Sequence, residues 1–455
     1  MNEQRAFLDI PRLDHVYRPV DERERDFAEV EMPLSDEQLR QQTSRCMNCG
    51  IPFCHGTGCP LDNLIPDFNA AVHRGDWRQA WELLSSTSPF PEFTSRVCPA
   101  LCEGSCTAGM NCGAVTIRQV EKAIVERAFA NGWVQPDQVA SRSGRRVAIV
   151  GGGPAGLSTA VILNRLGHNV TVYEKNAGPG GLMRYGIPDF KLFKQLIERR
   201  VQIMKKSGIR FVCDTEVGRD VSASYLTKQY DHLVLSCGTP VARDLSIPGR
   251  ELQGIHLALD FLAGQNRANA GELPAPPIVV KGQRVLVIGG GDTGSDCVGT
   301  SHRQGAASVT QIEIMPQPPA TRSSSTPWPL WPYLLRTSSS HEEGCERRWD
   351  LSTTAFVGEN GRVSGAKVHP VSWTCAPDGR PLKFTPTGNE EVIACDVVFL
   401  ALGFIKQSRQ QLLEQYGLAD SPAISICGDA ANGPSLVVRA IADGMAQART
   451  IDTTL

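Results

Sequence analysis

Two segments of the chain share one pattern of apolar and polar positions. In residues 146–156 and again in residues 284–294, a short, mostly apolar run leads into three consecutive glycines. Such a run ending at glycine predicts a buried strand, and the helical spacing after each glycine run predicts a helix. A second apolar strand follows each helix, at residues 169–174 and 308–313. The pattern therefore predicts two βαβ units.

The chain before residue 146 has a helical pattern. Ser35 and Gln38 stand at capping-box spacing, which predicts a short helix leading into the first cysteines. Residues 65–84 have helical spacing with two tryptophans four residues apart, which is typical of a packed helical face. We expect a small helical domain to about residue 130, followed by a polar linker over residues 131–146.

The C-terminal half contains further elements. Apolar runs at residues 233–237 and 397–402 each end at glycine and predict strands, and residues 434–448 predict a last helix. Residues 316–341, rich in Pro, Ser and Trp, predict a long surface connection. Together these elements indicate an α/β fold behind a helical N-terminal domain.

Composition and charge exclude several classes of protein. Of 455 residues, 41% are hydrophobic and 21% charged, which excludes a disordered or fibrous chain. With 46 basic and 48 acidic residues, the balance offers nothing to nucleic acid or to an anionic membrane. No apolar run reaches the roughly eighteen residues of a membrane span, and residues 1–5 lack the layout of a signal peptide. We expect a cytoplasmic protein.

The two glycine runs have the context of dinucleotide sites. Each follows a strand and opens a helix, so that the helix N-terminus would face a pyrophosphate. Glu174 and Glu313 end the second strands, near the spacing expected of a carboxylate that accepts from a ribose 2′-hydroxyl. Taken alone, such glycine motifs also occur by chance. Two of them in one chain indicate electron transfer between a flavin and a nicotinamide.

The cysteines are concentrated near the N-terminus. The two runs are Cys46-x2-Cys49-x4-Cys54-x4-Cys59-Pro60 and Cys98-Pro99-x2-Cys102-x3-Cys106-x5-Cys112. In a reducing cytosol, dense cysteine indicates metal or redox chemistry, and this spacing suits two iron-sulfur clusters. Zinc is the alternative, because eight cysteines could fill two four-sulfur sites. Zinc has no redox chemistry, so a chain with a flavin and a nicotinamide favours iron.

Several segments together resemble a known family, the small (β) subunit of bacterial glutamate synthase. They are residues 45–54, 96–99, 102–106, 115–117, 180–182, 185–191 and 289–294. The resemblance implies two nested, glutathione-reductase-like Rossmann domains with FAD on the first glycine loop and NADH or NADPH on the second. It also implies two 4Fe-4S clusters and a large partner subunit with FMN, the glutaminase and the glutamate-forming site.

The resemblance also divides the chain into domains. We expect a helical domain with both clusters over residues 1–140. The FAD-binding domain would comprise residues 141–265 and 397–455, and the NAD(P)H-binding domain residues 266–396.

The resemblance assigns cluster ligands position by position. One cluster would be held by Cys46, Cys49, Cys54 and Cys106, and the other by Cys59, Cys98, Cys102 and Glu121. Counting sulfurs instead makes Cys112 the eighth ligand, because thiolate is the more usual ligand of iron. The helical pattern around Glu121 could aim its carboxylate at a cluster, whereas Cys112 stands in a glycine-containing loop. We expect Glu121, and Cys112 is the alternative.

The expected nucleotide contacts follow from the same motifs. For FAD they are Gly151, Gly153, Ala155, Gly156, Glu174, Gly181, Leu182, Gly428 and Asp429; for the nicotinamide nucleotide they are Gly289, Gly291, Asp292, Thr293, Gly294, Glu313 and Arg322. Gly428 and Asp429 taken alone are only a turn before a helix. No side chain is expected to act as a catalytic acid or base, because the bound cofactors would exchange the hydride.

The predicted function is electron input to glutamate synthase for L-glutamate biosynthesis. Within the same class, the alternatives are a stand-alone NAD(P)H:ferredoxin-type oxidoreductase and a module serving a pyrimidine reductase. From a different class, the alternative is a non-catalytic assembly subunit stabilised by zinc.

Overall fold

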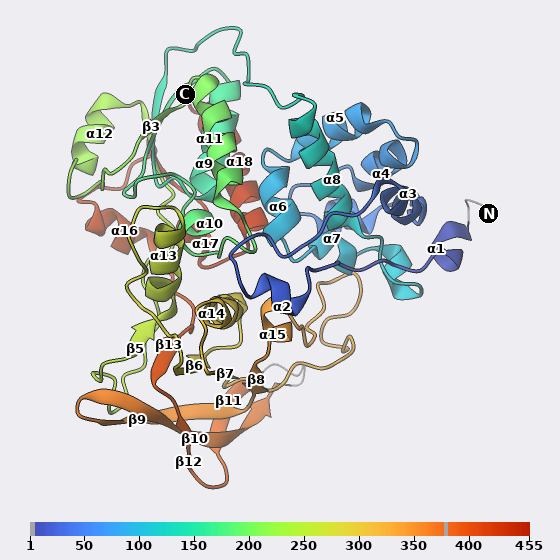
Figure 1. Cartoon of the computed structure of the whole chain (residues 1–455). Helices are drawn as coiled ribbons and strands as arrows, with labels where there is room; N and C mark the ends of the chain where they lie inside the picture. Colours follow the sequence, from blue (N-terminus) through green and yellow to red (C-terminus); the bar gives the residue numbers. More distant parts are fainter. Residues whose placement is uncertain (1–4, 377–380) are drawn as a thin grey trace.

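The computed structural model describes residues 5–376 and 381–455 (Figure 1). The first four residues, part of the stretch that lacks a signal-peptide layout, lie outside the described residues. No helix in the described parts of the chain is long and apolar enough to cross a membrane.

The N-terminal part is helical, as the sequence predicts (Figure 1). Its elements are α1 (Ala6–Asp9), α2 (Val20–Arg23), α3 (Asp36–Ser44), η2 (Cys54–Gly58), α4 (Ile65–His73), α5 (Trp77–Thr87), α6 (Pro91–Val97), α7 (Leu101–Gly104), η3 (Thr107–Met110) and α8 (Ile117–Ala130). The capping box of Ser35 and Gln38 at the start of α3 is confirmed. The segment 65–84 forms two helices rather than one, because Gly75 adopts a φ of +80° and Asp76 caps α5.

The first parallel sheet has the strand order β14-β4-β1-β2-β3. Its strands are β1 (Arg146–Val150), β2 (Asn169–Tyr173), β3 (Arg210–Val212), β4 (His232–Leu235) and β14 (Ile424–Ile426). The helices of this part are α9 (Pro154–Arg165), α10 (Leu182–Tyr185), α11 (Lys194–Lys206), α12 (Ala223–Gln229), α16 (Arg409–Gln415), α17 (Asp429–Asn432) and α18 (Val437–Asp452). The final helix is confirmed, and it packs along α9.

The second parallel sheet repeats this plan with the order β5-β13-β6-β7-β8. Its strands are β5 (Ile255–Leu257), β6 (Arg284–Ile288), β7 (Ser308–Ile312), β8 (Glu346–Arg348) and β13 (Val397–Leu400), accompanied by α13 (Ala258–Asn269), α14 (Asp292–Arg303) and α15 (Ser339–Glu342).

The strand pairing corrects the expected boundaries at residues 265 and 397. The domain division expected from the sequence places residues 255–257 and 397–400 in the FAD-binding domain, but β13 pairs with both β5 and β6 in the second sheet. Both strands are needed there to continue the sheet beyond β6. The chain therefore returns to the first sheet only after β13.

A four-stranded antiparallel sheet, which the sequence analysis did not predict, follows β8. It consists of β9 (Leu351–Glu359), β10 (Arg362–Cys375), β11 (Pro381–Pro386) and β12 (Glu391–Ala394). Figure 1 shows it in orange, beside the second sheet and away from the first.

One hydrophobic core joins the helical domain to the first sheet. It contains Phe68 and Ile124 of the helical domain together with Leu157 and Val201, from helices that accompany the sheet. A shared core makes the two parts one packed unit, which holds the N-terminal cysteines in a fixed position relative to the first glycine loop.

The N-terminal segment is tied to the second sheet by buried charges. Arg23 Nε lies 2.8 Å from Glu343 Oε1, and Arg303 Nη1 lies 2.6 Å from Glu343 Oε2. The side chains of Glu343 and Arg303 are fully inaccessible, and Arg23 is 2% exposed. Breaking a buried pair of this kind costs about 3–5 kcal/mol, so the N-terminal segment is firmly anchored.

Candidate redox site

The first glycine loop is shaped by contacts that leave no room for side chains. Gly151 adopts a φ of +104°, and a Cβ there would lie 2.5 Å from the carbonyl oxygen of Ser236. A Cβ on Gly156 would lie 2.0 Å from the carbonyl oxygen of Gly151. The buried Glu174 accepts a 2.9 Å hydrogen bond from the backbone N–H of Gly152. This tight turn directs the amino end of α9 toward the ligand position of a dinucleotide fold.

The second glycine loop has the same three contacts. Gly289 adopts a φ of +121°, with the carbonyl oxygen of Ala401 only 2.3 Å from the place of a Cβ. A Cβ on Gly294 would lie 2.3 Å from the carbonyl oxygen of Gly289. Glu313 accepts a 2.6 Å hydrogen bond from the backbone N–H of Gly290. The two loops are therefore equivalent in geometry as well as in sequence.

One glycine in each loop faces open space. A Cβ on Gly291 would meet no atom within 4 Å, and a Cβ on Gly153 would meet only the Cα of Gly181, at 3.9 Å. Their φ values of −80° and −74° suit any residue. Each leaves room beside a helix N-terminus where a pyrophosphate would lie, so both loops fit a bound dinucleotide.

Residues far apart in the sequence meet the first loop. A Cβ on Gly181 would lie 2.8 Å from the Cα of Gly153, and a Cβ on Gly428 would lie 2.5 Å from the Cβ of Ala155. Burial raises the pKa of Asp429, which follows Gly428. The structure thus brings the predicted FAD residues together at the start of α9.

The other predicted nucleotide residues lie in the first turns of helices. Leu182 begins α10 and is 47% exposed. Asp292 begins α14 and is exposed, and Thr293 beside it is half-buried.

A cavity of about 1110 Å³ connects the second glycine loop with the cysteine region. Gly291 and Glu313 line it on one side, and Cys98 and Ala100 line it on another. Leu436, the N-cap residue of α18, also lines it. The amino end of this helix therefore faces the cavity.

Arg322 does not lie with the other predicted nucleotide residues. Its guanidinium donates hydrogen bonds to the carbonyl oxygens of Thr326 and Leu330 and, at 2.9 Å, of Gly104 in the helical domain. The segment 316–341 is therefore more than the surface connection we expected. It packs against α7, where Trp331 lies close to Gly104.

Two arginines that the sequence analysis missed line the cavity instead. Arg336 stacks on Trp331 with 3.8 Å from its guanidinium carbon to the ring centre, and Arg347 stacks on Trp349 at 4.9 Å. Burial lowers the pKa of both guanidinium groups. Neither belongs to a local motif after β7, so no sequence signal identified them.

Four cysteines gather around η2 and the segment after α7. Burial raises the pKa of the Cys54 thiol to about 12, and the neighbouring charges of Cys106 and Cys46 raise it further. The charge of Cys49 acts in the same direction. We call this set group one: Cys46, Cys49, Cys54 and Cys106.

A second set gathers beside α8. Burial raises the pKa of Cys59 to about 12, and the charges of Glu121 and Cys98 add to the rise. Burial also raises the pKa of the buried Cys102 thiol, and the charge of Glu121 is the next cause. We call this set group two: Cys59, Cys98, Cys102 and Glu121.

Strained backbone directs N–H groups at the thiols. Asn48 and Ala100 adopt φ values of +48° and +65°, and each stands two residues after a cysteine. Burial raises the pKa of Cys46 and Cys98, and hydrogen bonds from the backbone of Asn48 and Ala100 oppose that rise. N–H donors to sulfur stabilise thiolate, the form that binds iron.

A buried amide also lacks a partner beside group one. Asn69 is fully buried, and neither polar atom of its side-chain amide has a hydrogen-bond partner in the described residues. Its side chain lies near the Cys46 thiol, and this polar contact, which falls short of a well-formed hydrogen bond, lowers the thiol pKa against the larger effect of burial. A cluster sulfur would satisfy this donor, so the residues present fit an iron-sulfur group. Over residues 5–376 and 381–455, no three His, Cys, Asp or Glu side chains are placed to hold a metal ion as they stand.

Glu121 and Cys112 have different surroundings. Glu121 is 6% exposed, and its Oε1 accepts a 2.9 Å hydrogen bond from Asn63 Nδ2. Burial raises the pKa of this carboxyl to about 7. The backbone of Cys112 is held by Arg45, and the Cys112 thiol is not among the main causes of the raised thiol pKa values described above.

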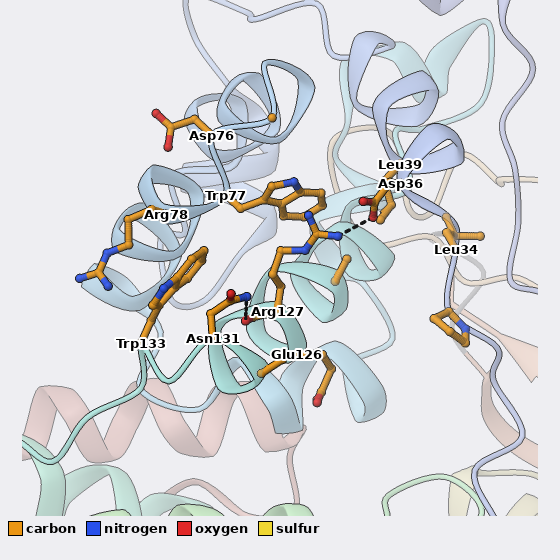
Figure 2. Close-up of a pocket in the computed structure, with 14 residues that line it drawn as sticks. Leu34, Asp36, Leu39, Asp76, Trp77, Arg78, Glu126, Arg127, Asn131 and Trp133 are labelled. Atoms are coloured by element: carbon orange, nitrogen blue, oxygen red, sulfur yellow. Dashed lines mark hydrogen bonds and ion pairs between the residues drawn. The ribbon is translucent and has the colours of Figure 1, made fainter.

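Another cavity, of about 880 Å³, lies on the helical domain (Figure 2). Arg127 lies over the ring of Trp77 at 3.8 Å and forms a 2.6 Å ion pair with Asp36. None of the cysteines or glycine-loop residues lines this cavity. It is therefore separate from the redox site.

Family models match both parts of the chain. Residues 23–133 match dihydropyrimidine dehydrogenase domain II, 4Fe-4S cluster, and residues 138–328 match pyridine nucleotide-disulphide oxidoreductase. The glutamate synthase (NADPH) small chain of Mycobacterium tuberculosis H37Rv is 47% identical over 96% of this chain and 93% of its own length. The corresponding small chain of Bacillus subtilis is 38% identical over 100% of this chain and 99% of its own.

The chain belongs to the glutamate synthase small-chain family. The predicted family, fold class and oxidoreductase class are thereby confirmed, and the chain is an NAD(P)H-dependent oxidoreductase with a 4Fe-4S domain.

Other relatives of the family differ in length. The glutamate synthase (NADH) of Schizosaccharomyces pombe is 41% identical over 99% of this chain, but this match covers 23% of the yeast protein. Among solved structures, FprA of M. tuberculosis in complex with NADPH matches 69% of this chain and 85% of its own, with a TM-score of 0.54 and 19% identity. At that identity the likeness shows the fold alone.

Proposed function

We propose that this small chain is the electron-input subunit of a glutamate synthase, which passes electrons from a nicotinamide nucleotide through FAD and two 4Fe-4S clusters to a large subunit. The cavity carries the proposal, because it brings the second glycine loop and Cys98 of group two to one space. A nicotinamide site and an iron-sulfur site on one cavity suit electron transfer from the first to the second through a flavin, which would accept the hydride and release single electrons.

The two glycine loops and the two ligand groups would each hold a different cofactor. FAD would lie on the first glycine loop with Glu174 and Gly428, and the nicotinamide nucleotide on the second loop with Glu313. The amino end of α18 faces the cavity, where its positive partial charge would favour an anionic reduced flavin. When bound, the flavin supplies the change from hydride to single-electron transfer. Group one and group two would hold one cluster each.

The partner would be a large subunit with FMN and the glutaminase and glutamate-forming sites. The chain matches relatives that are named small chains, and it matches only 23% of the length of the S. pombe glutamate synthase. In that protein most of the polypeptide therefore lies outside the part that resembles this chain. A second subunit would supply the corresponding part here.

The composition and activity of the purified full chain test this proposal. We expect one FAD and about eight irons per chain, from two four-iron clusters. The chain alone should oxidise the reduced nucleotide with an artificial acceptor and form glutamate from glutamine and 2-oxoglutarate only with the large subunit. Zinc in place of iron by elemental analysis, or glutamate formation by the chain alone, would contradict the proposal.

Nucleotide preference depends on the carboxylate of Glu313. It accepts hydrogen bonds from the backbone of Gly290 and Met315, which holds it at the position where a ribose 2′-hydroxyl is bound and a 2′-phosphate repelled. We expect NADH to be used at least as well as NADPH, and Glu313→Ala to move the ratio of kcat/KM values toward NADPH by about tenfold, the effect of about 1.4 kcal/mol.

Arg322→Ala is the matched control for this prediction. Its guanidinium is bound to loop carbonyl oxygens and to Gly104, so the nucleotide ratio should not change. A strong NADPH preference in the unmodified chain would mean that Arg336 and Arg347, which line the same cavity, outweigh Glu313.

A further inference from the structure

Arg45 is a fully buried cation directly before Cys46 of group one. Its side chain is 0% exposed. The guanidinium donates to the carbonyl oxygens of Ile10 at 3.0 Å, Ala114 at 2.7 Å and Cys112 at 2.6 Å. It also donates to Gly113, at 2.9 Å. All of these acceptors are neutral backbone groups.

No carboxylate neutralises Arg45 in the part of the chain that the structure describes. The acidic group that acts on it, Asp14, is mostly exposed and pairs with Arg12 at 2.5 Å. Arg12 also pairs with Glu103, at 2.7 Å, so the carboxylates in this region are engaged by Arg12 rather than by Arg45. A buried cation without a counter-charge is costly, so a nearby anion is to be expected.

Group two differs in this respect. Its neighbouring cation, Arg118, is 8% exposed in its side chain and pairs with Glu31 at 2.5 Å. Lys122 beside it pairs with Glu29 at 2.6 Å. The cations next to group two are therefore neutralised, whereas the one next to group one is not.

Arg45 lies beside group one. It directly precedes Cys46 in the chain, and its guanidinium donates to the carbonyl oxygens of Cys112 and Gly113, in the segment that follows Cys106. A fixed positive charge in this place stabilises negative charge that is added to group one, because Coulomb interactions are strong where water is excluded.

We propose that Arg45 is a positioning residue that raises the reduction potential of the group-one cluster above that of group two. The inference rests on the proposed function, because it requires a cluster in each group. Reduction adds one electron, and the fixed positive charge of Arg45 stabilises that added negative charge. Electrons that enter at group two, which lines the nucleotide cavity through Cys98, would then move downhill to group one.

A potentiometric titration of the full chain, followed by EPR, tests the proposal. Arg45→Gln should lower the one-electron reduction equilibrium constant of the group-one cluster about tenfold, which corresponds to about 59 mV. Arg45→Lys keeps the charge and should restore most of the potential. The group-two signal should be the same in all forms.

A second pair of variants leaves Arg45 and its hydrogen bonds in place. Cys112→Asp puts a carboxylate beside the guanidinium and should lower the group-one potential about as much as Arg45→Gln. Cys112→Asn introduces a side chain with the shape of aspartate but without its charge, and it should leave the group-one potential unchanged. If Arg45→Gln does not fold, this pair decides.

Two results separate the inference from the function on which it rests. Unchanged group-one potentials in Arg45→Gln and Cys112→Asp, at full iron content, would overturn the role of Arg45 alone. A full chain without iron would overturn the proposed function itself.

Discussion

Glu121→Ala is expected to remove or alter the group-two cluster, with up to four of about eight irons lost and a changed EPR signal. The carboxylate is buried beside Cys59 and Cys102, and α8 holds it on one face toward them. Its Oε1 is oriented by Asn63, whose Oδ1 accepts from Thr87 at 2.7 Å. Alanine would leave three thiolates and no fourth ligand.

Cys112→Ser is the matched control, and it should keep both the iron content and the EPR signals. After burial, Glu121 rather than Cys112 is the main charge that raises the pKa of the group-two thiols, and the loop that carries Cys112 is held by its backbone through Arg45. Iron loss in Cys112→Ser together with a normal signal in Glu121→Ala would give the eighth ligand to Cys112.

A single valine at the open glycine of one loop should abolish nucleotide binding at that loop and spare the other loop. Gly291→Val should lower the rate of nicotinamide oxidation more than about 100-fold, the effect of losing about 3 kcal/mol, while FAD stays bound. Gly153→Val should instead yield a chain without FAD. Since neither Cβ would meet protein atoms closer than 3.9 Å, the new side chains would take up ligand space rather than disturb the fold.

The absorption spectrum and steady-state kinetics of the two variants, with circular dichroism to show an intact fold, measure this effect. Gly132→Val offers a control, because Gly132 also has open space but lies in the linker. Its φ of +67° disfavours valine, so a small loss of stability is expected there without loss of FAD or activity. Normal FAD content in Gly153→Val would contradict the assigned site.

Local patterns predicted the two βαβ units well. Strands β1 and β6 lie where the apolar runs end at glycine, because a tight turn needs glycine at positions such as Gly151 and Gly289, and strands β2 and β7 lie at the apolar runs that follow each helix. The antiparallel sheet β9 to β12 was missed. Its strands are mostly half-exposed and lack a continuous apolar run, so no local signal distinguished them from loops.

The nucleotide loops, their carboxylates and each of the two cysteine runs were determined by the sequence itself, because each depends on residues within about thirty positions of one another. Long-range packing decided the rest. It set Cys106 beside Cys54 and Glu121 beside Cys59, placed β5 and β13 in the second sheet, and drew Arg322 away to Gly104. Contacts between distant segments form only when the whole core closes, because the entropy of loop closure is offset by burial spread over many residues. Local patterns along the chain do not record them, and only the family resemblance pointed to the two ligand groups.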